Sequence, residues 1–128
     1  MSRFLLDSSF VIDLLNEIAA NQRGPARAWA ARNPGAELWI SPVTSAEVLE
    51  GASDAAAVRE AFRAFRLQTI GHQHAERAAL RQRRAARRMG ENDAWQVAVA
   101  ECIDAVIVGH DPEAFERLGS GYADHRRA

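Results

Sequence analysis

Three short apolar runs constrain the fold most, because each is too short for a helix and is followed by a stretch with helical spacing. They occupy residues 4–6, 38–40 and 105–108. Apolar runs without polar alternation are typical of strands buried on both faces of a parallel sheet. Strands that alternate with helices predict an α/β domain with a mainly parallel central sheet flanked by helices.

The segments between these runs carry apolar residues at helical spacing. We expect helices over residues 10–20, 25–33, 43–50, 73–89 and 93–103, and shorter ones that begin at Asp54 and Asp111. Residues 68–70 carry only a faint strand pattern, and the tail 119–128 looks frayed. Because the 128 residues contain no linker-like segment, they predict a single domain over residues 1–128.

The charge of the chain excludes several classes of function. All 16 basic residues are arginine, and with 17 acidic residues the formal net charge is −1, so a uniformly basic nucleic-acid coat is excluded. Receiver-type phosphoacceptors and haloacid-dehalogenase-type phosphatases both need a lysine, which this chain lacks. The lone Cys102 has no disulfide partner and is expected in the core. With no signal-like start and no apolar run of roughly 20 residues, we expect a soluble, cytoplasmic protein.

Four acidic residues lie where the carboxyl ends of parallel strands would meet. Asp7 ends the first apolar run and Asp111 follows the last one, while Glu47 and Asp93 lie in helices that follow strand-like or turn segments. Ligands of open α/β sheets bind at this edge. Carboxylates gathered there would repel each other unless a cation lay among them, and an all-oxygen site suits Mg²⁺ or Mn²⁺.

Each of these acids also has a simpler interpretation. Asp93 and Asp111 could cap their helices, and Glu47 could be a solvated surface acid. Asp7 is the hardest to explain in this way, because an acid that ends a buried strand lies deep. Four other acids are interpreted mainly as exposed helix or turn charges: Asp13, Glu50, Glu101 and Asp104.

The surroundings of these acids resemble PIN-domain nucleases. The similar segments are residues 4–9, 43–51, 90–98 and 106–111, followed by Phe115, and they carry the four acids in the family's order. The small size is most similar to VapC-type toxins of toxin–antitoxin modules. Two departures stand out: Gly109 replaces the Thr or Ser that usually lies two residues before the fourth acid, and Phe115 falls one residue later than usual. The family's final strand is hard to see in residues 119–128.

The resemblance implies a Mg²⁺- or Mn²⁺-dependent endoribonuclease that is the toxin of a type II toxin–antitoxin system. It implies a homodimer that a VapB-type antitoxin inhibits by forming a higher-order complex with it. Asp7 and Asp93 would be the main metal ligands, with Glu47 and Asp111 completing the site, so that a metal-activated water hydrolyses the RNA phosphodiester. Ser8 would orient Asp7, unless it only caps the following helix. Two alternatives are a catalytically silent PIN-like module that binds RNA or protein, and a metal-independent ribonuclease with His110 as the base.

Arginines on the expected helix 73–89 are candidates for RNA binding. Arg77, Arg81, Arg84 and Arg88 form one stripe at helical spacing, which Arg83 and Arg87 widen. A second stripe comprises Arg59, Arg63 and Arg66. Either stripe could contact phosphates or could simply be a solvated helix face. His72 and His74 fit a polar helix entrance better than a transition-metal site.

Overall fold

The computed structural model describes residues 2–127, in which five parallel strands form one sheet in the order β3-β2-β1-β4-β5. The strands are β1 (Arg3–Leu6), β2 (Glu37–Ile40), β3 (Arg66–Leu67), β4 (Val106–Gly109) and β5 (Tyr122–Asp124). The helices are α1 (Ser8–Ala19), α2 (Pro25–Arg32), α3 (Pro42–Glu50), α4 (Ala55–Phe62), α5 (His72–Arg84), α6 (Glu91–Cys102), α7 (Pro112–Phe115) and the 3-10 helix η1 (Glu116–Gly121). The predicted α/β class and parallel sheet are confirmed.

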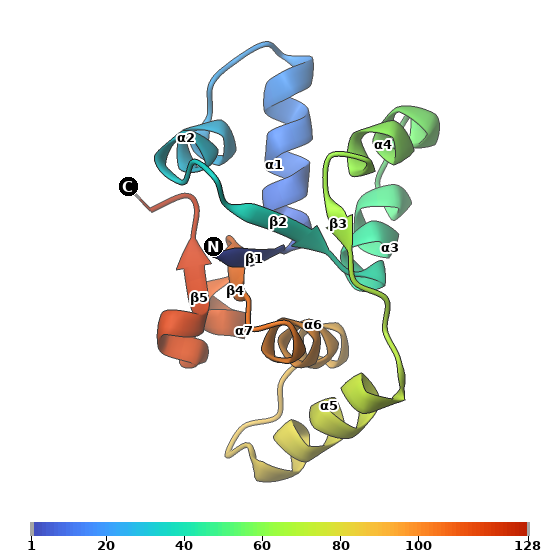
Figure 1. The fold of residues 1–128 in the computed structure, drawn as a ribbon, viewed down its shortest axis with the longest axis vertical. Helices are drawn as coiled ribbons and strands as arrows, with labels where there is room; N and C mark the ends of the chain where they lie inside the picture. The colour runs from blue at the N-terminus through green and yellow to red at the C-terminus, as the bar shows by residue number, and fades with distance from the viewer. Residues whose placement is uncertain (1, 128) are drawn as a thin grey trace.

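Helices cover both faces of this sheet (Figure 1), and successive residues of the central strands point into different layers. Leu5 and Ile107 are fully buried in a core shared with α6, whereas Leu6 and Val108 are fully buried against α1 and α2. This double burial explains why the strand segments contain no polar alternation. Among residues 2–127, no helix is long and apolar enough to cross a membrane.

The order of the strands creates a crevice between β1 and β4. The chain leaves β1 toward β2 on one side, while β4 pairs with the other side of β1. This reversal is the topological switch point at which open parallel sheets bind ligands, beyond the carboxyl ends of the strands. Asp7 follows β1 directly, and Asp111 follows β4 after one intervening residue.

Two of the expected elements were placed wrongly. The tail that looked frayed forms the end of η1 and then β5, which pairs with β4 over Tyr122–Asp124, while residue 128 lies outside the described residues. The helix expected over residues 73–89 ends at Arg84. It ends there because the Gln82 side chain bonds both the N–H and the C=O of buried Met89, at 2.9 and 2.8 Å. This tertiary contact overrides the helical propensity of residues 85–88.

Candidate active site

Asp7 is held rigidly at the edge of the sheet. It is buried and forms the N-cap of α1, and its backbone N–H donates to Val108 O at 2.9 Å. The Ser9 hydroxyl donates to Asp7 Oδ2 at 2.6 Å, and the Ser9 N–H donates to the same oxygen at 3.3 Å. The hydroxyl that contacts this carboxylate thus belongs to Ser9 rather than to Ser8, although the Ser8 backbone also acts on Asp7 and lowers its pKa. Burial raises the pKa of Asp7, and the bonds from Ser9 oppose that effect.

Ser9 also explains the unusual glycine at position 109. Its hydroxyl accepts a hydrogen bond from the His110 N–H at 2.8 Å while donating to Asp7, so it bridges the ends of β1 and β4. A Cβ on Gly109 would lie 2.6 Å from Asp7 Cβ and 2.8 Å from Ser9 Oγ. The place beside Gly109 is thus taken by Ser9, which brings a hydroxyl to this edge from the other strand.

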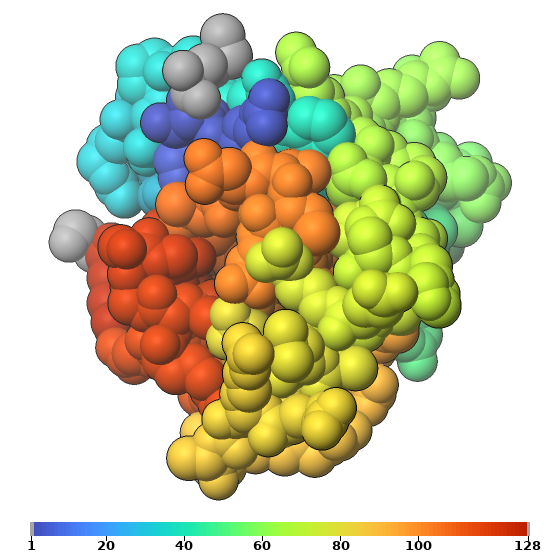
Figure 2. All heavy atoms as spheres, turned by 60° about the horizontal axis from the view of Figure 1, so that its bottom comes forward, coloured from blue at the N-terminus to red at the C-terminus, as the bar shows by residue number. Residues whose placement is uncertain are grey.

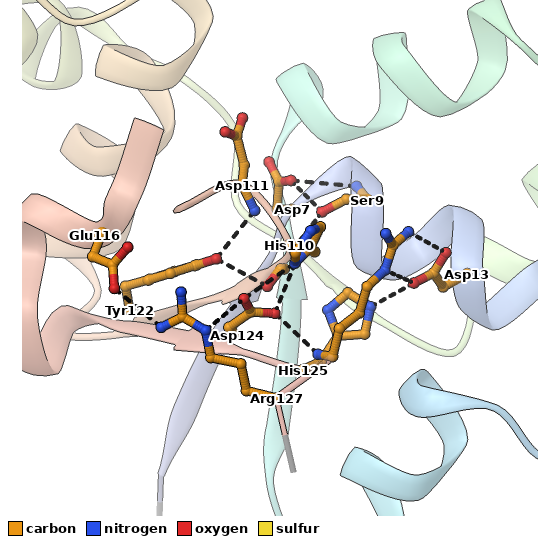
Figure 3. Close-up of polar contacts among 12 residues, drawn as sticks. Asp7, Ser9, Asp13, His110, Asp111, Glu116, Tyr122, Asp124, His125 and Arg127 are labelled. Atoms are coloured by element: carbon orange, nitrogen blue, oxygen red, sulfur yellow. Dashed lines mark hydrogen bonds and ion pairs between the residues drawn. The ribbon is translucent and has the colours of Figure 1, made fainter. Parts of the chain in front are cut away.

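The other three predicted acids converge on Asp7 from three separate elements. Glu47 lies in α3, Asp93 in the first turn of α6, and Asp111 at the N-cap of α7, where its Oδ1 accepts the Ala114 N–H at 3.2 Å. Figure 3 shows the carboxylates of Asp7 and Asp111 pointing to the same side of the sheet edge. Asp111 does cap α7, as the simpler interpretation predicted. The same carboxylate also acts electrostatically on Asp7 and Asp93.

The electrostatics of the four acids show that they act on one another. Burial, followed by the charges of Asp111, Asp7 and Glu47, raises the pKa of Asp93 to about 6. Burial and the charge of Asp7 raise the pKa of Glu47 as well, although hydrogen bonds of Ser8 and Asn92 oppose the rise. Carboxylates that raise each other's pKa values form a site that attracts a cation.

A buried polar chain beneath the acids joins the three elements that carry Asp7, Glu47 and Asp93. Gln96 on α6 donates to Thr44 Oγ1 at 2.8 Å, and Thr44 donates to Leu6 O at 2.7 Å. The Ser41 hydroxyl donates to the Gln96 amide oxygen. All three side chains are almost completely buried. Sequence reasoning missed this chain, although a Gln on an otherwise apolar helix face is a signal that could have revealed it.

The donor set fits a hard cation bound partly through water. Within residues 2–127, no three His, Cys, Asp or Glu side chains form a ready-made coordinating group. Mg²⁺ commonly takes one or two carboxylates directly and keeps several waters, which suits four oxygen donors spaced around a crevice. The chemistry of the donors and the raised pKa of Asp93 both favour such an ion.

A second polar cluster ties the C-terminal segment to the body of the domain. Asp13 accepts from His125 Nε2 at 2.7 Å and from Arg126 Nε at 2.9 Å, so its interpretation as an exposed charge was wrong. Beside it, both oxygens of Asp124 lie 3.1 Å from His110 Nδ1. Figure 3 shows these residues gathered next to Ser9. This cluster stabilises β5, which the sequence pattern did not reveal.

The predicted arginine stripe is only partly preserved. Arg77, Arg81 and Arg84 lie on α5, but Arg88 lies in the following loop and pairs with Glu91 at 2.8 Å, because the helix ends earlier than expected. Arg81 pairs with Glu101 at 2.9 Å. Arg87, Arg88 and the unpredicted Arg117 line a hollow of about 410 Å³ together with Asp93 and Asp111.

The remaining candidates have structural roles or none. His74 is buried and its Nδ1 accepts the Gly71 N–H at 2.8 Å, while exposed His72 lies 3.3 Å from Glu76, so the pair forms a helix entrance as expected. Cys102 is exposed at the end of α6 rather than in the core. Its exposure follows from the break of the helix at that point, where the chain turns into β4.

Fold and site together define a three-layer α/β domain with a crevice of carboxylates at the edge of a parallel sheet. The family model for the PIN domain matches residues 4–120, and the chain belongs to the PIN domain family. The resemblance stated from the sequence is thereby confirmed. A comparison with curated proteins gives no match.

Several solved structures share the fold over nearly the whole chain. A toxin–antitoxin complex from Klebsiella pneumoniae aligns with a TM-score of 0.76 and 26% identity, over 94% of this chain and 96% of the other. VapBC-1 from nontypeable Haemophilus influenzae aligns with a TM-score of 0.73 and 20% identity, over 98% and 99%. VapC20 from Mycobacterium tuberculosis, a toxin that cleaves the Sarcin-Ricin loop, aligns with a TM-score of 0.69 and 21% identity, over 91% and 95%.

Proposed function

We propose that this protein is a Mg²⁺- or Mn²⁺-dependent endoribonuclease and the toxin component of a toxin–antitoxin pair. The observation that carries the proposal is the convergence of Asp7, Glu47, Asp93 and Asp111 from four distant segments, with the pKa of Asp93 raised by burial and then by the charges of the other three. Membership of the PIN domain family supports nuclease chemistry, and the kinship in fold with toxin–antitoxin structures supports the biological role.

The four acids would differ in how directly they bind the metal ion. Asp7, fixed by Ser9, and Asp93, at the start of α6, would be the principal ligands of the ion. Glu47 and Asp111 would complete the site directly or by orienting waters. When bound, the ion supplies an acidified water and neutralises charge on the scissile phosphate, so the products would carry a 5′-phosphate and a 3′-hydroxyl.

The partners follow from the same relatives. The structure from Klebsiella pneumoniae is a toxin–antitoxin complex, and we propose a VapB-type antitoxin as the partner of this chain. We also propose that the chain forms a homodimer. A cytoplasmic location would follow from an RNA substrate and such a partner. The alternative of a catalytically silent module had Gly109 as its motivation, and the Ser9 hydroxyl next to that glycine weakens it.

An RNA cleavage assay with identification of the product ends tests this proposal. Cleavage that requires Mg²⁺ or Mn²⁺, yields 5′-phosphates and is absent in Asp7→Asn is the expected result. Cleavage that persists in EDTA and leaves 2′,3′-cyclic ends would instead point to His110, whose ring is oriented by Asp124. A complete lack of cleavage and of calorimetric metal binding would favour the silent module.

A further inference from the structure

A hollow of about 600 Å³ lies beside the C-terminal half of α5, next to the smaller hollow that contains Asp93 and Asp111. It is bounded by the C-terminal half of α5, the loop 85–87, the end of α6 and η1. Figure 2 shows α5 and this loop, in yellow, next to the C-terminal segment, in red. Its charged lining residues are Arg77, Arg81, Arg84, Arg87, Arg117 and Glu101.

The charges of this hollow are not balanced. Glu101 pairs with Arg81 at 2.9 Å, and among residues 2–127 no carboxylate lies within 4.0 Å of the other four guanidinium groups. Arg117 Nη1 instead donates to Arg87 O at 2.7 Å, which fixes η1 against the loop. Since the whole chain has a formal net charge of −1, four such guanidinium groups in one concavity are a local feature, and only Arg117 among them acts on an acid of the site, Asp93. Like charges held together in this way favour an anion among them.

The hollow adjoins the candidate active site. Arg87 and Arg117 line it, and the same two arginines line the smaller hollow that contains Asp93 and Asp111. An extended polyanion could therefore pass from the acids to the larger hollow without leaving arginine contacts. The acids alone would repel such a chain, so cations beside them are needed to hold it.

We propose that this hollow binds backbone phosphates of the RNA on one side of the cleaved bond; this rests on the proposed function. The guanidinium fork matches the geometry of phosphate oxygens, and phosphate contacts position a nucleic acid without reading its sequence. No aromatic side chain lines the hollow, so it holds backbone rather than stacked bases. Arg81 is set apart from the other arginines, because its charge is already compensated by Glu101.

Binding of RNA to a cleavage-deficient protein tests the proposal directly. Within the Asp93→Asn background, Arg77→Ala/Arg84→Ala is compared with Arg23→Ala/Arg32→Ala, which removes two exposed arginines near α2. Fluorescence anisotropy with a labelled single-stranded RNA is measured over a range of salt concentrations. We expect the α5 pair to weaken binding on the order of tenfold and to reduce the salt slope of log K by about 1.4, since single strands release about 0.7 counterions per phosphate contact.

The control pair is expected to leave both quantities unchanged. Equal losses in the two double variants would reduce the effect to general charge and overturn the proposal, as would unaltered RNA binding by the α5 pair. If the α5 pair instead loses affinity for polyglutamate but not for RNA, the hollow belongs to an acidic protein segment and the proposal is wrong.

Substitution of single phosphates separates this proposal from the cleavage proposal. Methylphosphonate, which is neutral, replaces one phosphate at a time on either side of the cleaved bond, and kcat/KM is measured for the wild-type protein and Arg77→Ala/Arg84→Ala. We expect losses on one side only, and we expect them to disappear in the variant. If the wild-type protein cleaves RNA normally but methylphosphonates lower kcat/KM equally in both proteins, the proposed role of the hollow is refuted and the nuclease proposal is not. Absence of wild-type cleavage would refute the nuclease and leave the anisotropy result to decide on the hollow.

Discussion

Replacing Asp93 by asparagine should stabilise the protein in the absence of divalent metal. The side chain is partly buried and faces three other carboxylates, and together these effects raise its pKa from 3.8 to about 6. At neutral pH the carboxylate is mostly charged in both states, but its charge costs more free energy in the folded state than in the unfolded state. Asparagine keeps the shape of the side chain and removes the charge that is repelled.

The size of the gain follows from the pKa. A rise of about two units corresponds to roughly 3 kcal/mol between the protonated and charged forms. Because the carboxylate is not deeply buried, solvent screening reduces this to about half. The charge also interacts favourably with the N-terminus of α6, which offsets about 0.5 kcal/mol. We expect a net gain of about 1 kcal/mol, or about 3–5 °C in Tm for a domain of this size.

The gain must depend on pH in a defined direction. Because the folded pKa lies above the unfolded value, the folded protein binds more protons at Asp93 between pH 3.8 and about 6. The penalty is thus complete above pH 6 and is lost as the pH falls toward 4. Urea unfolding in EDTA at about pH 7.5 and about pH 4 should show the gain at the higher pH only.

A matched control is Asp104→Asn. Asp104 is an exposed acid with a φ of 54°, a left-handed conformation that asparagine adopts as readily as aspartate. This variant should unfold like the wild type at both pH values. An Asp93→Asn protein that melts below the wild type, or that gains equally at both pH values, would show that Asp93 is structural and would refute the reasoning.

Three further outcomes are expected. Mg²⁺ should stabilise the wild-type protein by about 2.7 kcal/mol at 100 times its Kd and should shift the Tm of Asp7→Asn far less, as thermal melts would show. Asp13→Ala should cost about 1–3 kcal/mol in urea unfolding, because buried His125 loses its partner. Since hydrogen bonds lower the pKa of Asp13, that difference should shrink as the pH falls below 3.8. Gly109→Ala should cost about 1–3 kcal/mol in the same assay, because its Cβ would press on Ser9 Oγ.

The central strands could be predicted because their signal is local. Residues 4–6, 38–40 and 105–108 form inner strands whose side chains are buried or partly buried between the two helix layers, so their apolar character alone reveals them. β5 gives no such signal, since Tyr122–Asp124 is a short edge strand of partly buried residues. It is stabilised by Asp13, which lies more than a hundred positions earlier, and a pattern within the segment cannot show that contact.

The four acids could be identified as candidates, but their supports could not. Asp7 is recognisable because it ends a buried strand, whereas the choice between Ser8 and Ser9 depends on the geometry of the helix N-terminus. Gly109 was a departure from the family pattern when it was considered alone. The glycine is explained only by Ser9, whose hydroxyl occupies the space between β1 and β4 that a side chain at position 109 would need.

In a chain without lysine, every positive charge other than histidine is an arginine, so residue type does not separate structural cations from functional ones. Their partners do. Arg126 forms two hydrogen bonds to Asp13, and Arg127 contacts Glu116 and Asp124, so both guanidinium groups are paired with carboxylates of the same domain.

The arginines around the hollow beside α5 differ in that only Arg81 has a carboxylate partner among the described residues. A fold that pairs its C-terminal arginines closely but leaves Arg77, Arg84, Arg87 and Arg117 unpaired retains their repulsion when no ligand is bound. The four acids retain an analogous repulsion, visible in the raised pKa of Asp93. Two adjoining sites of opposite charge, each relieved by the opposite ion, are what a metal-dependent enzyme acting on a polyanion requires.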